Sequence, residues 1–229
     1  MTLAKYLNRI ALTASLLVGA VVLEPAVTAS AIAPAVAPSS VRSTAPSVLL
    51  VGDDPVVPAA LTALAEAATY QRTRSARALL RLAAARDKVA TAIALRLDLD
   101  PAAMRRAWQN ADLDHQMVVL AAMSQLGVPY RRNTSKPGVS FDCSGLTTWA
   151  WQQAGVALPR SSYRQIRAFE NIRLAEAQAG DLVYYPGHVM LYLGTGNAIV
   201  HAPQRGDDVK VGTLSARRAR WVRLADPLV

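Results

Sequence analysis

The sequence contains only one cysteine, Cys143, among its 229 residues. A single thiol cannot form a disulfide within the chain, and a structural zinc site usually takes four cysteine and histidine ligands at short spacings. The sequence has three histidines, without a C-x-x-C or an H-x-x-x-H pattern. It also lacks a glycine-rich phosphate-binding loop and a G-x-S-x-G serine motif. We therefore expect no metal and no other cofactor.

Acidic residues are also scarce, with 16 aspartates and glutamates against 25 lysines and arginines, which gives a net charge of +9. A basic balance favours negatively charged partners. The basic residues are not interleaved with aromatic residues, and the sequence contains no nucleic-acid motif. We expect an anionic cell envelope as the partner and no nucleic acid.

The first 31 residues have the pattern of a secretory signal peptide. Lys5 and Arg9 precede an uncharged apolar run at 10–23, and small residues follow around 29–33. This run is shorter than the roughly 17–25 residues of a membrane-spanning helix. We therefore predict a signal peptide at 1–31, no stable membrane anchor after its cleavage, and a protein secreted to the cell wall or periplasmic space.

The rest of the chain divides by composition into three parts. Residues 32–58 are rich in proline and alanine, which indicates an extended linker. Residues 59–110 show apolar side chains at helical spacing, with Asp100-Pro101 as a helix start. This helical segment is interpreted as a spacer, or as a module that binds the wall or covers a cleft.

Residues 111–229 are predicted to form one α+β domain, because helices come first and strands follow. We expect helices at 114–126 and from 143 to 155, each ending near a glycine. An antiparallel sheet is expected from strands at 182–185, 188–193, 198–201, 209–211 and 221–224.

Cys143 lies at the expected start of the second helix of this domain. The unpaired N–H groups and the positive end of the helix dipole favour a thiolate there, so we expect the pKa of Cys143 to be lowered. Gly145 is expected to leave room for a substrate. The alternative is that Cys143 is a small buried core residue.

Two of the histidines are predicted to share one face of a β-hairpin. Pairing Leu193 with Ala198 across the turn at 194–197 places Met190 opposite His201. His188 and His201 then become diagonal neighbours. This arrangement suits a catalytic base and an orienting partner for a thiol nucleophile. His115 is expected on the surface.

Several ordered motifs resemble the NlpC/p60 family of cysteine peptidases, which cut the peptide stems of bacterial peptidoglycan. The motifs are Leu126-Gly127-Val128-Pro129-Tyr130, Phe141-Asp142-Cys143-Ser144-Gly145-Leu146, Leu158-Pro159-Arg160-Ser161-Ser162, Gly180-Asp181-Leu182-Val183, Gly187-His188-Val189 and Val200-His201-Ala202-Pro203. The resemblance implies a papain-like domain at 111–229.

The resemblance also implies a role for each residue of the site. Cys143 would attack the substrate, His188 would act as base and then acid, and His201 would orient His188. The residues implied to bind the substrate are Tyr130, Asp142, Ser144, Arg160 and Ser161. The implied substrate is a peptidoglycan stem peptide, cut between D-glutamate and a diamino acid.

One loop departs from the family pattern. The family often has Tyr-x-Trp-Gly-Gly before the nucleophile, whereas here residues 131–138 follow Tyr130 without the tryptophan and the paired glycines. The three basic residues of this loop are expected either to contact stem-peptide carboxylates or to be solvated. Alternative functions are a peptidoglycan amidase or acyltransferase, and a non-catalytic or regulatory cell-wall-binding protein on the same fold.

Overall fold

The structure, a computed structural model, describes residues 54–229. The expected signal peptide, 1–31, and most of the expected linker, 32–58, lie outside these described residues. The first helix, α1, begins at Val56, slightly before the expected boundary at 59. No helix among the described residues is both long enough and apolar enough to cross a membrane.

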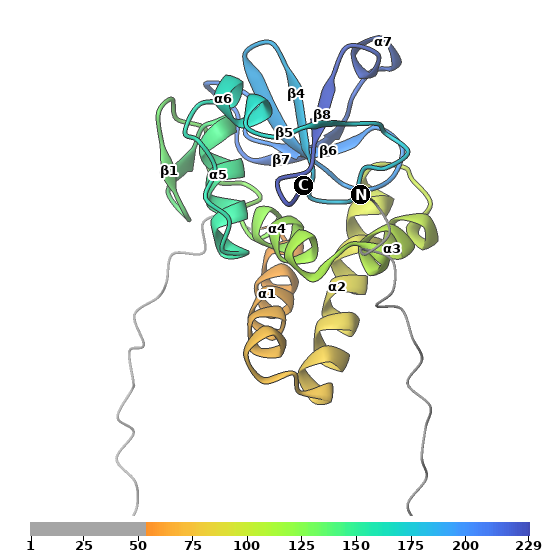
Figure 1. The fold of residues 1–229 in the computed structure, drawn as a ribbon. Helices are drawn as coiled ribbons and strands as arrows, with labels where there is room; N and C mark the ends of the chain where they lie inside the picture. The colour runs from red at the N-terminus through yellow and green to blue at the C-terminus, as the bar shows by residue number, and fades with distance from the viewer. Residues whose placement is uncertain (1–53) are drawn as a thin grey trace, which may run out of the picture. The chain divides into compact units, whose positions relative to one another are not determined.

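Helices make up the first part of the described chain, as expected (Figure 1). α3 begins at the predicted Asp100-Pro101, where the Asp100 side chain accepts a hydrogen bond of 2.8 Å from the N–H of Ala102. The helices before the sheet are α1 (Val56–Thr73), α2 (Ala76–Arg96), α3 (Pro101–Asn110), α4 (Leu113–Met123), α5 (Cys143–Gln153) and α6 (Ser162–Arg167).

The strands form a six-stranded sheet in the order β3-β8-β4-β5-β6-β7, and every neighbouring pair is antiparallel. The predicted α+β class with an antiparallel sheet is therefore confirmed. These strands are β3 (Asn171–Ile172), β4 (Leu182–Tyr185), β5 (His188–Tyr192), β6 (Ala198–His201), β7 (Lys210–Thr213) and β8 (Arg223–Ala225). The sequence did not predict β3, the short helices α6 and α7 (Ala216–Ala219), or the two-stranded hairpin of β1 (Ser135–Lys136) and β2 (Ser140–Phe141).

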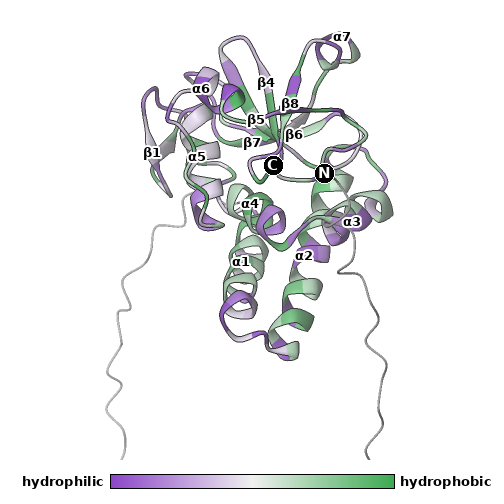
Figure 2. Cartoon of the chain, viewed as in Figure 1, coloured by the Kyte–Doolittle hydropathy of each residue, from purple (hydrophilic) through white to green (hydrophobic). Residues whose placement is uncertain are grey.

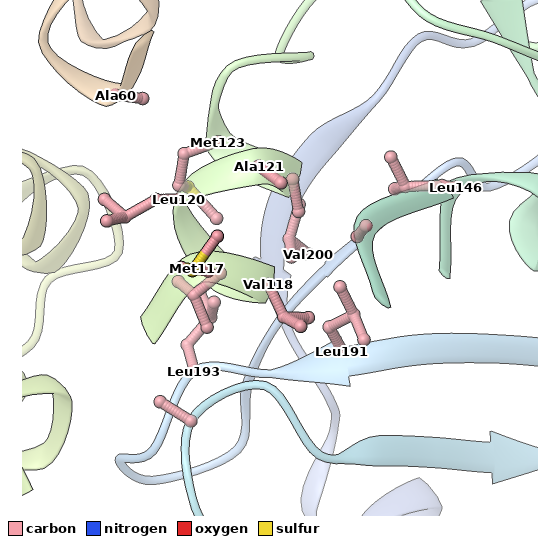
Figure 3. Packing of buried hydrophobic residues seen from close by; sticks show 14 of the residues in the cluster. Ala60, Met117, Val118, Leu120, Ala121, Met123, Leu146, Leu191, Leu193 and Val200 are labelled. Atoms are coloured by element: carbon pink, nitrogen blue, oxygen red, sulfur yellow. The ribbon is translucent and has the colours of Figure 1, made fainter. Parts of the chain in front are cut away.

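The central element of the core is α4, which is buried on all sides from Met117 to Met123. A helix that is apolar all round is covered on every side. Figure 3 shows α4 between Ala60 of α1 and the sheet residues Leu191 and Val200. Hydrophobic residues accordingly concentrate where the strands converge on the helices (Figure 2).

The helical segment before residue 111 shares this core. Ala60, Leu82 and Trp108, from α1, α2 and α3, belong to the same buried cluster as the sheet residues. The indole N–H of Trp108 donates a 2.9 Å hydrogen bond to the carbonyl of Leu193, at the end of β5. Next to it, a Cβ on Gly194 would lie 2.9 Å from the Ala107 Cβ. α3 thus supports the hairpin that carries His188 and His201.

His115 is fully buried, so the expectation that it lies on the surface was wrong. Its Nε2 lies 2.9 Å from Asp181 Oδ1 and 3.3 Å from Asp226 Oδ1. Burial by itself lowers the pKa of His115, but the hydrogen bonds to Asp181 and Asp226 outweigh it and raise the pKa to about 9. This buried ion cluster joins α4 to the start of β4 and to the residue that follows β8.

The His115 cluster predicts a loss of stability at alkaline pH. Because the folded pKa of about 9 exceeds the unfolded value of about 6.5, the stabilisation is complete below the unfolded pKa and is lost as the pH rises through the folded one. The His115→Gln variant should be less stable at neutral pH by about 3–5 kcal/mol, because it leaves buried carboxylates without their cation. Urea unfolding at several pH values measures both effects.

The variant is also its own control for the pH dependence. Glutamine does not titrate, so the alkaline fall in the free energy of unfolding should be much smaller in His115→Gln than in the wild type. Equal alkaline slopes in the two proteins would contradict a protonated His115.

Candidate functional site

Cys143 is the first residue of α5, as the sequence predicts, and it is half-buried. The preceding Asp142 caps the helix, because its Oδ1 accepts a 2.7 Å hydrogen bond from the N–H of Gly145. The cap fixes the first turn of α5 and thereby the position of the thiol.

The thiol itself does not have the lowered pKa that its helix position suggested. Burial raises the pKa of Cys143, and the charge of Asp142 raises it further. Hydrogen bonds from the backbone N–H groups of Val189 and Ser144 act in the opposite direction without reversing the shift. Desolvation therefore outweighs the helix terminus, and Cys143 is a neutral thiol near neutral pH.

The hairpin of β5 and β6 has the predicted register. Leu191 pairs with Val200 and Tyr192 pairs with Ile199. The same register places Met190 opposite His201. His188 Nε2 lies 2.9 Å from His201 Nδ1, with the two rings close to perpendicular at 74°. The structure thus brings the two predicted histidines into direct contact.

Both imidazoles are neutral at neutral pH. Burial lowers the pKa of His188 to about 4, with a further contribution from the charge of Arg218, whose guanidinium lies 4.7 Å from the Tyr185 ring centre. Burial also lowers the pKa of His201 to about 4, together with the charges of His188 and Lys210. A neutral imidazole can accept a proton, which is the state that a general base needs.

The thiol meets the histidine hairpin at the start of β5. The N–H of Val189, which hydrogen-bonds to the Cys143 sulfur, belongs to the residue directly after His188. Within residues 54–229, the sulfur makes no hydrogen bond to the His188 ring itself. Since His201 occupies Nε2 of His188, Nδ1 is the ring nitrogen of His188 that His201 does not engage.

Four of the five predicted substrate-binding residues lie together beside Cys143. Arg160 forms a two-pronged ion pair with Asp142, with Nη1–Oδ1 at 2.9 Å and Nη2–Oδ2 at 2.7 Å. The same Nη1 donates to Ser144 Oγ at 2.9 Å. Ser161 caps α6 by accepting from the N–H of Arg164. A cavity of about 700 Å³ is lined by these residues, namely Arg132, Asn133, Asp142, Ser144, Arg160, Ser161, Ser162 and Arg164.

The fifth predicted residue, Tyr130, lines a second cavity of about 760 Å³ with Arg131, Arg132, Gln204 and Arg205. Burial raises the pKa of the Tyr130 hydroxyl, and the charges of Cys143 and Asp142 raise it further, which places the hydroxyl within electrostatic reach of both. No residue of 54–110 lines either cavity. This gives no support to the interpretation that the helical segment covers the cleft.

Gly145 does not provide room for a substrate, contrary to the expectation. A Cβ at this position would lie 2.0 Å from the carbonyl oxygen of Thr134. That oxygen accepts hydrogen bonds from the N–H of Asp142 at 3.0 Å and from Arg160 at 3.1 Å. The glycine therefore allows the loop at 131–138 to approach the first turn of α5 and fix its position.

Two groups of residues near the site were not predicted from the sequence. Gln165 is fully buried and joins α5 to α6, since it accepts a 2.7 Å hydrogen bond from Thr147 and donates a 3.0 Å bond to the Ser144 carbonyl. Gln165 lies three residues after the Leu158-Pro159-Arg160-Ser161-Ser162 motif, which was a usable signal. Gln204 and Arg205 follow the His201 motif closely, but only the fold shows that they face the Tyr130 loop.

The C-terminal part of the chain is similar to known proteins. Residues 127–222 match the NlpC/P60 family. The chain is 43% identical over 101 residues to the probable endopeptidase Rv2190c of Mycobacterium tuberculosis, which covers 43% of this chain and 26% of that protein. It is 38% identical over 126 residues to the peptidoglycan endopeptidase RipB of the same species, which covers 48% of this chain and 51% of RipB.

A solved structure gives a further comparison. RipD of Mycobacterium tuberculosis is described as a non-catalytic NlpC/p60 domain protein adapted to peptidoglycan binding. Its structure is 28% identical in sequence to this chain, with a TM-score of 0.41, and the match covers 51% of this chain and 98% of the RipD chain. The matches to Rv2190c and RipB cover only part of those proteins: this chain spans 26% of the length of Rv2190c and 51% of the length of RipB.

The raised pKa of Cys143 predicts how the thiol reacts with an alkylating reagent. Only the thiolate is alkylated, so the rate with iodoacetamide should be low at neutral pH and should rise through the alkaline range, above the ordinary thiol value of about 8.5. Mass spectrometry of the intact protein measures this rate, and since Cys143 is the only cysteine, every alkylated thiol is assigned. A rate already constant below about pH 7.5 would instead show a preformed thiolate.

Proposed function

We propose that this chain, whose residues 127–222 match the NlpC/P60 family, is a secreted peptidoglycan endopeptidase that hydrolyses a stem-peptide amide through the thiol of Cys143. The relatives RipB and Rv2190c are named as endopeptidases, and RipB as one acting on peptidoglycan. Their similarity supports a cell-wall hydrolase. The cysteine mechanism rests on the residues of the site.

One observation carries the proposal, namely the hydrogen bond between His188 Nε2 and His201 Nδ1 at 2.9 Å. A nucleophile and base system needs a third group that holds the base in one tautomer and one orientation. His201 meets this need if its Nδ1 accepts the Nε2 proton of His188. Nδ1 of His188 is then unprotonated and can accept the proton of the thiol.

The chemistry begins with a neutral thiol and a neutral imidazole. As the sulfur of Cys143 attacks the carbonyl carbon of the stem-peptide amide, the thiol proton passes to Nδ1 of His188. The tetrahedral intermediate collapses to a thioester, and the protonated His188 gives its proton to the leaving amine. Water then attacks the thioester, His188 accepts a proton from it, and the acid product leaves with the thiol restored.

The first turn of α5 would stabilise the negative charge on the intermediate. Backbone N–H groups at a helix start point toward an anion, and the helix dipole adds to their effect. The N–H of Gly145 is already engaged by Asp142. The N–H of Ser144 is engaged by the Cys143 sulfur, so the N–H of Cys143 itself is the donor we assign to the oxyanion. Contact between Cys143 and His188 would tighten once substrate is bound, as catalytic hydrogen bonds often do.

The substrate would lie along the cavity lined by Asp142, Ser144 and Arg160. We propose that the bond cut joins D-glutamate to a diamino acid, as the family resemblance implies. Arg160 already neutralises much of the Asp142 charge through its two-pronged ion pair. An amino group of the substrate would therefore compete with Arg160 for Asp142. The predicted signal peptide at 1–31 supports a location in the cell wall or periplasmic space.

Digestion of purified peptidoglycan tests this function. The wild type should release muropeptide fragments, and Cys143→Ala should release none above background, because the attacking atom is absent. His188→Ala should be as inactive as Cys143→Ala, whereas His201→Ala should retain a fraction of the activity, because it removes the orienting group but not the base. Liquid chromatography with mass spectrometry measures the fragments and identifies the bond.

Three outcomes would contradict the proposal. Equal release by the wild type and Cys143→Ala would exclude the thiol mechanism, and no release by either would favour a non-catalytic wall-binding protein. Fragments separated between glycan and stem peptide would instead show an amidase. Arg77→Gln, a change on the exposed surface of α2, is a matched control that should leave digestion unchanged.

A further inference from the structure

Three arginines from two distant parts of the sequence line one cavity. Arg131 and Arg132 follow Tyr130, and Arg205 lies in the connection between β6 and β7. Backbone hydrogen bonds hold the two segments side by side, from the N–H of Tyr130 to the carbonyl of Asp207 at 2.8 Å and from the N–H of Val209 to the carbonyl of Val128 at 2.8 Å. The fold itself therefore brings these three guanidinium groups around one cavity.

The positive charge in this cavity has no internal counterion. Arg131, Arg132 and Arg205 form no ion pair with any carboxylate in residues 54–229, and no acidic side chain lines the cavity. The nearby carboxylate of Asp207 is engaged by Lys210 at 2.6 Å. Three arginines that line one cavity without a carboxylate favour an anion supplied from outside.

The cavity adjoins the cavity beside the proposed catalytic residues, with which it shares Arg132. Tyr130 lines it, and the hydroxyl of Tyr130 is within electrostatic reach of Cys143. Arg132 lines both this cavity and the one that contains Asp142 and Ser144. An anion bound here would thus lie close to the amide under attack. This position favours an anionic group of the peptide substrate itself over a phosphate of a separate wall polymer.

We propose that the cavity of Arg131, Arg132 and Arg205 binds a free carboxylate of the stem peptide, on a residue next to the amide that is cut. The proposal rests on the proposed function and adds a preference to it. A planar guanidinium matches a carboxylate with two parallel hydrogen bonds and loses the charge-assisted part of that contact when the group is a carboxamide. The site therefore discriminates between stem peptides with a free carboxylate and those in which it is amidated.

Binding in the Cys143→Ala background tests the preference without requiring cleavage. The ligands are a synthetic stem peptide and variants in which one free carboxylate at a time is a carboxamide, measured by isothermal titration calorimetry. We expect one of these amidations to raise the Kd about tenfold, the value of one charge-assisted contact. In the double variant Cys143→Ala/Arg132→Gln, the Kd of the carboxylate peptide should rise by about the same factor. The difference in Kd between the carboxylate peptide and that amidated peptide should then disappear.

The controls separate this proposal from its alternatives. Arg205→Gln should act like Arg132→Gln, and Arg77→Gln on α2 should leave both Kd values unchanged. Equal binding of all the peptides would overturn the carboxylate site. Inorganic phosphate that competes as well as the carboxylate peptide would show a general anion site and would also overturn it. If the wild type fails to digest peptidoglycan while the peptide preference persists, the proposed function fails and the binding site stands.

Discussion

The contact between His188 and His201 is the interaction on which the account of this site depends, and it exists only because of one hairpin register. A shift of one residue would turn one of the two side chains to the other face of the sheet. The rest of the fold keeps that register. Trp108 hydrogen-bonds to the carbonyl of Leu193, the residue after β5, and the fully apolar middle of α4 packs beneath the hairpin. The helical segment at 59–110 is thus part of the support for the histidine pair.

Desolvation sets the protonation states around this pair. Burial lowers the pKa of both histidines and raises the pKa of Cys143. A thiolate facing an imidazolium is therefore not the resting state, so in the proposed mechanism the proton is transferred during the attack. His115 shows the opposite balance, because two carboxylates keep a buried imidazole charged. Burial thus leaves His188 and His201 neutral, as the proposed base and its partner require, whereas His115 is a structural cation.

The sequence predicted the features that follow from local rules. Strand alternation and a short turn fix the hairpin register, and Asp142 before Cys143 is a recognisable helix cap. Features that depend on distant partners were not predictable. His115 can be buried only because Asp181 and Asp226 pair with it, and neither aspartate is near it in sequence. Position 145 requires glycine because the Thr134 carbonyl approaches it closely. The pKa of Cys143 depends on the burial of the thiol, which no local sequence pattern predicts.

The central claim is that His188 is a neutral base held by His201, and a titration of the histidine side chains by ¹⁵N nuclear magnetic resonance tests it most directly. The account predicts that His188 and His201 stay neutral until the pH falls to about 4, while His115 stays protonated until the pH approaches about 9. The spectra should also show His188 protonated at Nε2 and unprotonated at Nδ1. A His188 that is protonated at neutral pH, or that carries its proton on Nδ1, would contradict the account.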